Sequence, residues 1–522
     1  MMPTGDNAGL PVVGKRRRLL FVTGNTSGIE PYFYLSAVRP WVEGLGHHFE
    51  VTCLEEPDGL DAAVERVRPD LLLFFGAKTR LLYSGPVFDC RARFGIPVAA
   101  LTLMDAHSPA KQAFFEHAWR LGVEACFCID TGMREMCGGF ADAVYYCPWF
   151  VNHEITRDFG EPKRIPVALI GDGFLSTGTD WRYPWRRAVA GKLREEFPTF
   201  SSPRPTSRFP HELVGEAYGR MLNRSLLAFS CGGSRHIFMK KNLEIPASRC
   251  CMVSEVNAGL LHLGFRDMEN CVFVTPSDAV EKCRYLLEHP DELQALTDRG
   301  FRFVREHHDA RNRTMIAEWL MLRLDLPAGR RIVQPDVCGP LRAVPVDSGE
   351  RGVLLTGESP FVSGMEQASS RWSTGDVSGC LAAIEDAARM LPLTMEPKFL
   401  KALVALAEGD PRGAVDGFQE ILRLGIFWGA ERPDPLLWGF YLLALDRSGQ
   451  TETAARLAAA FPDVDHPVLR DVRASLGAAG VGGGPACPSV FASPWFFPES
   501  PEAFLAALRA TVEQNCSGGG PA

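Results

Sequence analysis

Short apolar segments alternate with amphipathic segments through the first 150 residues. The apolar segments include RRLLFVTG (17–24), HFEVTCLE (48–55), LLLFFGA (71–77) and IPVAALTLMD (96–105). Stretches of helical pattern, such as LDAAVERVRPD (60–70), lie between them. Continuous apolar strands separated by helices are typical of parallel sheets covered on both faces. The short spacing is that of right-handed crossovers. The sequence therefore predicts a doubly wound α/β domain over 16–150.

The same alternation restarts at Arg164. IPVALIGDGF (165–174) reads as a strand ending in a glycine turn, and LLAFSCG, CCMVSE and CVFVT follow as strands between helices. Three helical stretches close this second run at about residue 323. We therefore expect a second Rossmann-like domain over 151–323, in tandem with the first.

Beyond residue 323 the pattern changes. Residues 324–364 are rich in proline, glycine and valine, and we interpret them as a linker with at most a strand or two. Over 365–478 the pattern is helical, and three helices begin at Gly375, Gly409 and Gly449, 34 and then 40 residues apart. Helix pairs at a 34-residue period indicate tetratricopeptide-like repeats, and another helical bundle is the alternative. Residues 479–522 are predicted to be a tail with one short helix, PEAFLAALRATVEQ.

Composition excludes some classes of protein. The chain contains no run of 18 apolar, uncharged residues, which predicts no membrane span. Its net charge of −8 argues against nucleic-acid binding, which favours a basic surface. The 15 cysteines are irregularly spaced and form no CxxC pair. Reduced, buried thiols in a cytoplasmic protein fit this pattern better than a disulfide framework or a zinc site.

Ligands of open parallel sheets bind beyond the carboxyl ends of the strands, and two such domains suggest a cleft between them. In the first domain, Asp105 and His107 follow a strand and could contact sugar hydroxyls or transfer a proton. A helix cap made by Asp105 is the alternative. In the second domain, Gly171 and Gly173 form a turn that a ligand could approach closely. Arg186 lies near the start of the next helix and could bind phosphate, with a solvated helix face as the alternative.

The segment MKKNLEIPASRCCMVSE (239–255) combines cations with an isolated carboxylate. At the start of a helix, backbone N–H groups and Lys241 could hold a diphosphate. Glu244 could accept hydrogen bonds from the two ribose hydroxyls of a nucleotide. Glu255 ends the next strand, where it would face the cleft. The alternative is an ordinary i,i+3 salt bridge between Lys241 and Glu244 on a helix surface.

Several motifs in a fixed order point to a known family. YPWRR (183–187), YGRMLNRSLLAFS (218–230), KKNLEIPASRCCMVSE (240–255) and VFVTPSDAVEKCRYLLEHPDE (272–292) resemble the C-terminal half of GT-B glycosyltransferases. The resemblance is to the CgeB-like branch of the glycosyltransferase group 1 family. It covers roughly residues 150–320. Over 16–150 only the order of predicted strands and helices is similar, and the helical region is not covered.

This resemblance implies two Rossmann-like domains with a nucleotide-sugar donor in the cleft, held by the second domain without a metal. Glu244 matches the carboxylate that binds the donor ribose, and Lys241 matches a basic residue three positions earlier. Arg186 matches a phosphate contact. Two positions depart from the family: His236 replaces a glutamate eight residues before Glu244, and Arg249 replaces a glycine.

We therefore expect a cytoplasmic glycosyltransferase that moves a sugar from a nucleotide-diphosphate sugar to an acceptor hydroxyl, with no cofactor besides the donor substrate. The helical repeats would offer a groove for a protein acceptor or a surface glycan. Two alternatives remain open. The chain could be a catalytically degenerate scaffold that binds proteins through its repeats, or a nucleotide-sugar epimerase of the same fold.

Overall fold

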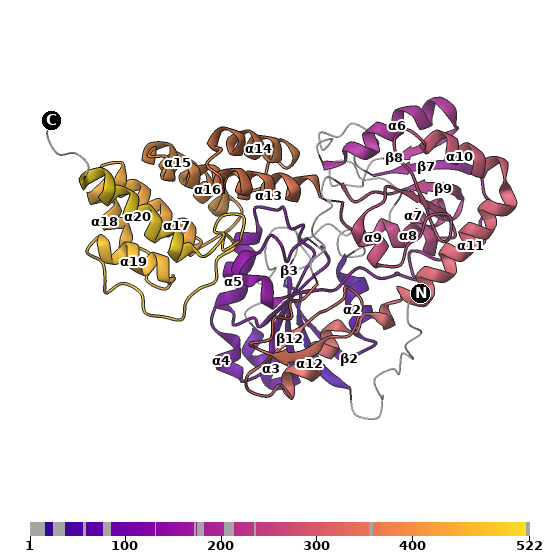
Figure 1. The fold of residues 1–522 in the computed structure, drawn as a ribbon. Helices are drawn as coiled ribbons and strands as arrows, with labels where there is room; N and C mark the ends of the chain where they lie inside the picture. Colours follow the sequence, from indigo (N-terminus) through magenta and orange to yellow (C-terminus); the bar gives the residue numbers. More distant parts are fainter. Residues whose placement is uncertain are drawn as a thin grey trace.

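A computed structural model shows two α/β domains and a helical region (Figure 1). The structure describes residues 16–24, 37–55, 59–76, 85–130, 132–171, 174, 182–202, 213, 215–233, 236–353 and 359–517. None of the helices within these ranges combines the length and the apolarity needed to cross a membrane.

The first domain is built on a six-stranded parallel sheet of order β2-β1-β3-β4-β5-β6. Its strands β3 and β4 are buried along their whole length, as their uninterrupted apolar sequences predict. The strands are β1 (Arg17–Val22), β2 (Phe49–Leu54), β3 (Leu71–Gly76), β4 (Val98–Thr102), β5 (Ala125–Cys128) and β6 (Val144–Tyr146). The helices are α2 (Arg39–Leu45), α3 (Leu60–Val67), α4 (Cys90–Phe94), α5 (Lys111–Arg120) and the 3₁₀ helix η3 (Gly138–Ala143).

The second domain has a five-stranded parallel sheet of order β11-β10-β9-β7-β8. Its strands are β7 (Ile165–Ile170), β8 (Thr199–Ser202), β9 (Ser225–Phe229), β10 (Cys251–Ser254) and β11 (Val272–Phe273). The helices are α6 (Pro184–Glu196), α7 (Glu216–Asn223), α8 (Lys241–Ala247), α9 (Ala258–His262), α10 (Ala279–Glu288) and α11 (Pro290–His307). The prediction of two parallel-sheet, Rossmann-like domains is confirmed.

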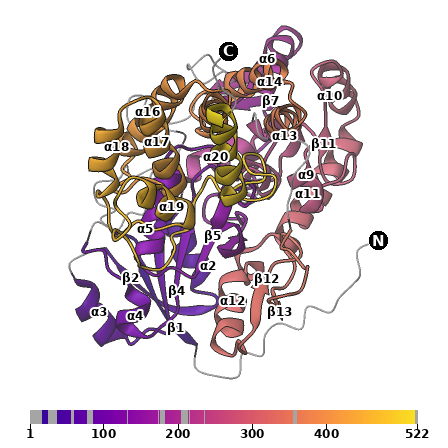
Figure 2. The same ribbon diagram turned by 60° about the vertical axis from the view of Figure 1, so that its left-hand side comes forward.

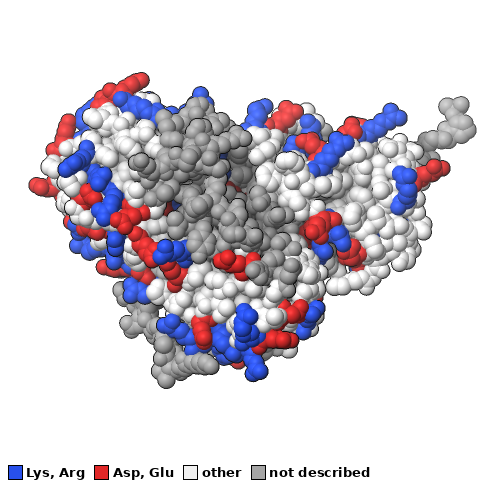
Figure 3. Space-filling view, turned by 180° about the vertical axis from the view of Figure 1, so that it is seen from behind, with Lys and Arg blue, Asp and Glu red and all other residues white. Residues whose placement is uncertain are grey.

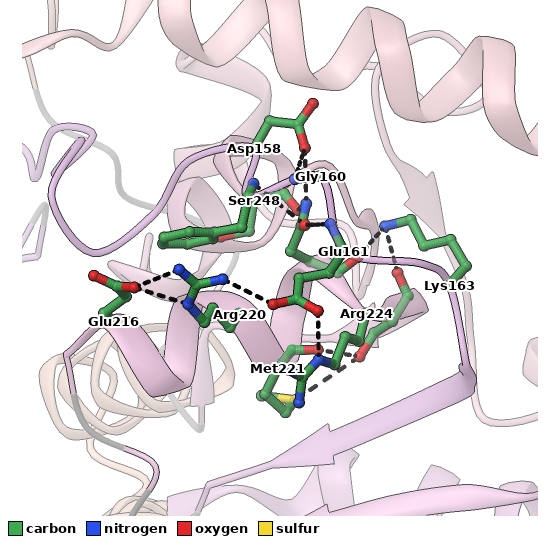
Figure 4. A network of polar contacts seen from close by, with 12 residues as sticks. Asp158, Gly160, Glu161, Lys163, Glu216, Arg220, Met221, Arg224 and Ser248 are labelled. Carbon is green, nitrogen blue, oxygen red and sulfur yellow. Dashed lines mark hydrogen bonds and ion pairs between the residues drawn. The ribbon is translucent and has the colours of Figure 1, made fainter.

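A polar network fixes the amino ends of these strands (Figure 4). The Lys163 ammonium donates to the carbonyl oxygens of Asn223 at 2.7 Å and Ser225 at 2.8 Å, and also to that of Arg249. The Asn223 amide donates to the Ser248 carbonyl at 2.9 Å. Burial lowers the pKa of Lys163. Because these side chains join the starts of β7, β9 and β10, the opposite, carboxyl ends of the strands are the edge at which a ligand can bind.

The chain returns to the first domain before residue 323. Helix α12 (Met315–Leu324) packs Trp319 edge-on against Phe127 of β5. Gln334 then pairs with the backbone of Tyr146, accepting from its N–H at 2.6 Å and donating to its carbonyl at 2.9 Å. The predicted boundary at 323 therefore differs from the structure, because α12 buries its apolar face on the first sheet. The predicted linker, 324–364, contains the hairpin β12 (Arg330–Val333) and β13 (Arg342–Pro345).

The helical region consists of helices packed in consecutive pairs. Gly375, Gly409 and Gly449 each lie between the two helices of a pair, at φ of 80°, 80° and 85°. Only glycine adopts this conformation without strain, so these residues mark equivalent turns. The assignment to the tetratricopeptide type stays a prediction. The helices are α13 (Pro360–Ser373), α14 (Val377–Met390), α15 (Glu396–Ala407), α16 (Pro411–Phe427), α17 (Pro435–Arg447), α18 (Thr451–Ala458), α19 (Pro467–Ser475) and α20 (Pro501–Ser517).

Part of the predicted tail, 479–522, belongs to the core. Phe491 stacks on Phe399 of α15 at 4.2 Å between ring centroids, and Phe497 stacks on Phe440 of α17 at 5.6 Å. The Gly139 N–H of the first domain donates to the Ser489 carbonyl at 2.7 Å. This segment, yellow in Figure 2, thus joins the helical region to the first domain, because its aromatic side chains are buried there.

The helical region also docks directly on α5. Lys111 and Glu396 form an ion pair in which the side chains are 1% and 2% exposed. The Thr394 hydroxyl donates to the His107 carbonyl at 3.3 Å. The docking surface therefore lies next to the loop that follows β4, at the carboxyl edge of the first sheet (Figure 1).

Candidate functional site

Two cationic side chains meet at Gly171, directly after β7. The Lys241 ammonium, from the start of α8, donates to the Ile170 carbonyl. A Cβ atom at residue 171 would lie 2.8 Å from Lys241 Nζ and 3.4 Å from Arg186 Nη1. Gly171 also has a φ of 104°, which side-chain-bearing residues rarely adopt. The glycine therefore leaves room for both cations at the carboxyl end of a central strand. Gly173 lies outside the described residues.

Arg186 is buried in the first turn of α6, with 4% of its surface exposed. Its Nε donates to Cys231 Sγ at 3.0 Å. The guanidinium lies 4.1 Å from the ring centroid of Tyr183 and 5.2 Å from that of Phe174. Aromatic faces attract a desolvated cation, so this arrangement stabilises a positive charge that water barely reaches. The alternative of a solvated helix face for Arg186 is wrong.

Glu255 follows β10 and is 7% exposed. It accepts a hydrogen bond from the Gly232 N–H at 2.8 Å. Burial raises the pKa of Glu255 to about 7, and the Gly232 N–H and the charge of Arg186 act in the opposite direction. Its carboxyl group therefore titrates near neutral pH at the same edge of the sheet as the two cations.

Glu244 lies on α8, where its carboxylate contacts two neighbours. Its Oε1 is 3.2 Å from Lys240 Nζ, and its Oε2 accepts from the Tyr218 hydroxyl at 3.2 Å. The Lys240 ammonium in turn lies 5.2 Å from the ring centroid of Trp149, which belongs to the segment between the two sheets. The alternative from the sequence, an i,i+3 pair between Lys241 and Glu244, is therefore wrong. Glu244 pairs with Lys240 at i,i+4, and Lys241 contacts the end of β7.

Asp105 links the two α/β domains. Its carboxylate forms an ion pair with Arg182, which precedes α6. The Arg182 guanidinium lies 5.5 Å from the ring centroid of Tyr183, and Arg186 contacts this same ring. Asp105 is therefore connected to the Arg186 cluster through Arg182 and Tyr183. His107 is 9% exposed, and its backbone carbonyl accepts from Thr394 of the helical region. His107 therefore lies next to the helical region.

The two positions that depart from the family have different surroundings. Arg249 follows α8 with a φ of 51°, a left-handed conformation that glycine adopts freely. Its side chain pairs with Asp158 and Asp298, near the amino ends of the strands. This substitution therefore concerns a helix end away from Gly171. His236, with a φ of 52°, lies in the turn after Gly233, adjacent to the candidate site.

Sequence reasoning missed the aromatic and sulfur partners of this site. Tyr183 and Cys231 contact Arg186, and Tyr218 and Trp149 complete the surroundings of Glu244 and Lys240. Two of these residues belong to the motifs that carry the family resemblance: Tyr183 to YPWRR and Tyr218 to YGRMLNRSLLAFS. Within the described ranges, no three His, Cys, Asp or Glu side chains gather in a way that could hold a metal ion. The face seen from behind in Figure 3 has positive and negative side chains interspersed.

Comparison with known proteins gives a match for the second domain. Residues 163–320 match a protein-family model described as "Glycosyl transferase-like". No curated protein matches the sequence significantly.

Among solved structures, sucrose-phosphate synthase from Thermosynechococcus elongatus is 11% identical, with 59% of this chain and 99% of that chain covered and a TM-score of 0.36. HepE from Anabaena, solved with UDP-glucose, is 10% identical, with 59% and 100% covered and a TM-score of 0.35. A glycosyltransferase from Rickettsia africae is 11% identical, with 60% and 97% covered and a TM-score of 0.37. The family model alone makes the second α/β domain similar in sequence to the glycosyl transferase-like family, and the cluster around Gly171 lies inside the matched residues.

Proposed function

We propose that this protein transfers a sugar from a nucleotide-diphosphate sugar to an acceptor hydroxyl. The observation that supports this most is the convergence of Arg186 and Lys241 on Gly171, at the carboxyl end of a strand in the domain that matches a glycosyl transferase-like family. A buried arginine and a partly buried lysine beside a glycine that a phosphate could approach suit a diphosphate leaving group.

In the proposed reaction, the acceptor oxygen forms a bond to the anomeric carbon while the bond from that carbon to the diphosphate oxygen breaks. Negative charge grows on the leaving diphosphate, and Arg186 and Lys241 would stabilise it without reorganisation. We propose no metal for this step, because the two side chains supply positive charge. Glu244 would bind the ribose hydroxyls, and Asp105 or His107 would accept the acceptor proton or contact the sugar.

The acceptor would enter from the side of the first domain, onto which the helical region docks. A protein or a surface glycan are the two acceptor classes that such a region suits. A degenerate scaffold would differ from the transferase in its lack of turnover. It would either bind the nucleotide without releasing a product or not bind the nucleotide. An epimerase would convert the donor sugar with no acceptor present.

The proposal is tested with a panel of nucleotide sugars incubated with the full chain, measuring release of the nucleoside diphosphate and the identity of the remaining sugar. Arg186→Ala, Lys241→Ala and Glu244→Ala should each reduce release by about a hundredfold or more, as expected for groups that contact the transition state. Lys192→Ala is the matched control, since this exposed lysine of α6 donates to the Pro276 carbonyl away from Gly171.

Release that depends on Lys241 but not on Lys192 supports the transferase. Nucleotide binding, seen as a rise in melting temperature, with no release from any donor would favour the scaffold. Conversion of the donor sugar without an acceptor would favour the epimerase.

A further inference from the structure

A large cavity lies between the first α/β domain and the helical region. Its volume is about 1060 Å³. Five segments form its wall: the stretch after β5 with η3, strand β12, the turn after β13, helix α13, and residues 492–498. Pockets for a single small molecule are typically about 300–1,000 Å³, so this cavity has room for several linked units.

One arginine in the cavity wall has unsatisfied hydrogen-bonding capacity. Arg134 is 5% exposed, and its Nη1 is buried with no hydrogen-bond partner among the described residues. A Cβ atom at Gly352 would lie 1.6 Å from Nη1, so the glycine leaves space for the guanidinium. The nearest carboxylate, Asp142, is 3.8 Å from Nη2. An unsatisfied buried donor costs about 1–3 kcal/mol, so Arg134 contributes a positive charge to the wall whose hydrogen-bonding capacity the described residues do not use in full.

The charged side chains of the wall balance in sign. Besides Arg134, the lining includes Arg331 and Arg351 as cations and Glu135, Asp142 and Glu366 as anions. Such a lining gives no preference to a polyanion or a polycation. It does place donors next to acceptors, and this suits a hydroxyl group, which both donates and accepts.

Hydroxyl groups and small side chains complete the wall. Ser369, Ser370 and Ser373 of α13 line the cavity, and Trp495 contributes an aromatic side chain. The other apolar lining residues are small, or are proline or valine. Grooves that bind peptides usually offer apolar pockets or an unpaired strand edge, and this wall is instead hydroxyl-rich and mixed in charge. The lining thus favours a polyhydroxylated ligand over a peptide.

The cavity is connected to the loop of the candidate site in the first domain. Arg134 and Glu135 follow Asp130, whose carboxylate accepts from the Ala106 N–H at 2.7 Å. Ala106 lies between Asp105, which contacts Arg182, and His107. The carboxylate of Asp130 therefore holds the loop of Asp105 close to the stretch that contributes Arg134 and Glu135 to the cavity wall.

We propose that this cavity binds an oligosaccharide, which serves as the acceptor or its anchoring part. Its role as an acceptor site rests on the proposed transferase function, whereas the binding itself does not. Guanidinium and carboxylate groups would bind the hydroxyls, and the serine-lined face of α13 would contact successive sugar rings.

The test is calorimetric titration of the full chain with cellotetraose, chitotetraose and mannotetraose, and with a serine- and threonine-rich peptide of similar length. Ser370→Trp, on the exposed cavity face of α13, should fill the cavity. Ser363→Trp is the matched control, because Ser363 is an exposed serine of the same helix that does not line the cavity. Glu366→Ala provides a second variant that removes an acceptor without adding bulk.

At least one tetrasaccharide should bind with a Kd below about 1 mM, and Ser370→Trp and Glu366→Ala should each weaken it by about tenfold or more. Ser363→Trp should leave the Kd unchanged. UDP should raise the melting temperature of wild type and Ser370→Trp equally, since the donor site is separate.

The proposal is overturned if no tetrasaccharide binds, if Ser370→Trp binds as tightly as wild type, or if the peptide binds in the cavity and the saccharides do not. Saccharide binding that persists when no donor is turned over would support the cavity site and reject the transferase. Donor turnover without saccharide binding would support the transferase and reject the cavity site.

Discussion

At the residue scale, the second sheet places opposite charges close together in a site that water barely reaches. Arg186 is 4% exposed and Glu255 is 7% exposed, and each interacts with the charge of the other. The pKa of Glu255 rises to about 7 because burial disfavours its ionised form more than Arg186 favours it. Two predictions at single residues follow, one for this carboxyl and one for Gly171.

The first concerns pH. Since the folded-state pKa of Glu255, about 7, exceeds the value of about 4.3 for an unfolded glutamate, the folded state binds more protons between these values. Stability conferred by this group is therefore full below about pH 4 and declines as pH rises to about 7. Glu255→Gln keeps an acceptor for the Gly232 N–H and should remove this decline, gaining about 3 kcal/mol relative to wild type between pH 4.5 and 7.5. Urea unfolding at several pH values measures it, and parallel curves for the two proteins would contradict it.

The second concerns Gly171→Ala. The added methyl would meet Lys241 Nζ at 2.8 Å, and the backbone would be strained at a φ of 104°. UDP affinity should fall by about tenfold or more, with about 1–3 kcal/mol of lost stability from strain. Gly160→Ala is the control, because Gly160 has a φ of 66° with no atom within 4 Å of the added Cβ. Equal UDP affinity in the two variants would show that Gly171 contributes only backbone conformation.

At the scale of the element, single acidic side chains fix how helices begin and what they contact. Asp410 caps α16 by accepting from the Gly413 N–H alone, and it is exposed. Asp434 caps α17 and accepts from the Leu436 and Leu437 N–H groups. It also accepts from the Ser489 hydroxyl and the Val490 N–H of the C-terminal segment. Asp434 therefore joins a helix start to a segment 55 residues later.

Replacing these two caps should have unequal effects. Asp410→Ala should cost about 1 kcal/mol, the usual loss for an exposed N-cap. Asp434→Ala should cost about 3 kcal/mol, because several buried donors lose their partner at once. Denaturant unfolding followed by the helical circular dichroism signal measures both. Equal losses would mean that the contacts of Asp434 with Ser489 and Val490 do not stabilise the fold.

At the scale of the whole molecule, the helical region is docked on the first domain through a buried ion pair. Lys111 of α5 pairs with Glu396 of α15, next to the loop of Asp105 and His107. This docking places the helical region beside the loop that follows β4 in the first domain (Figure 1).

Removing one partner of this pair should be far more damaging than removing both. Lys111→Met leaves the Glu396 carboxylate buried without its cation and should cost about 3–5 kcal/mol. The double variant Lys111→Met with Glu396→Leu should recover most of this loss, since a well-packed apolar pair often replaces a buried ion pair. Lys398→Met, which breaks the more exposed pair with Glu420, should change stability by less than about 1 kcal/mol. Thermal melting of the four proteins tests this, and a double variant as unstable as Lys111→Met would contradict it.

The sequence by itself determined the two parallel sheets, because strands buried on both faces must be apolar along their length, as LLLFFG of β3 is. It also located the turns at Gly375, Gly409 and Gly449, since glycine adopts a positive φ without the strain that a side chain causes.

Tertiary structure alone decided which charges meet. Lys240 and Lys241 are neighbours in sequence, yet one pairs with Glu244 and the other reaches the end of β7. The same holds for the pairing of Asp105 with Arg182, the return of α12 to the first sheet and the burial of Phe491. Apart from the local i,i+4 pair of Lys240 with Glu244, each of these contacts joins segments far apart in the chain, and local periodicity contains no information about such contacts.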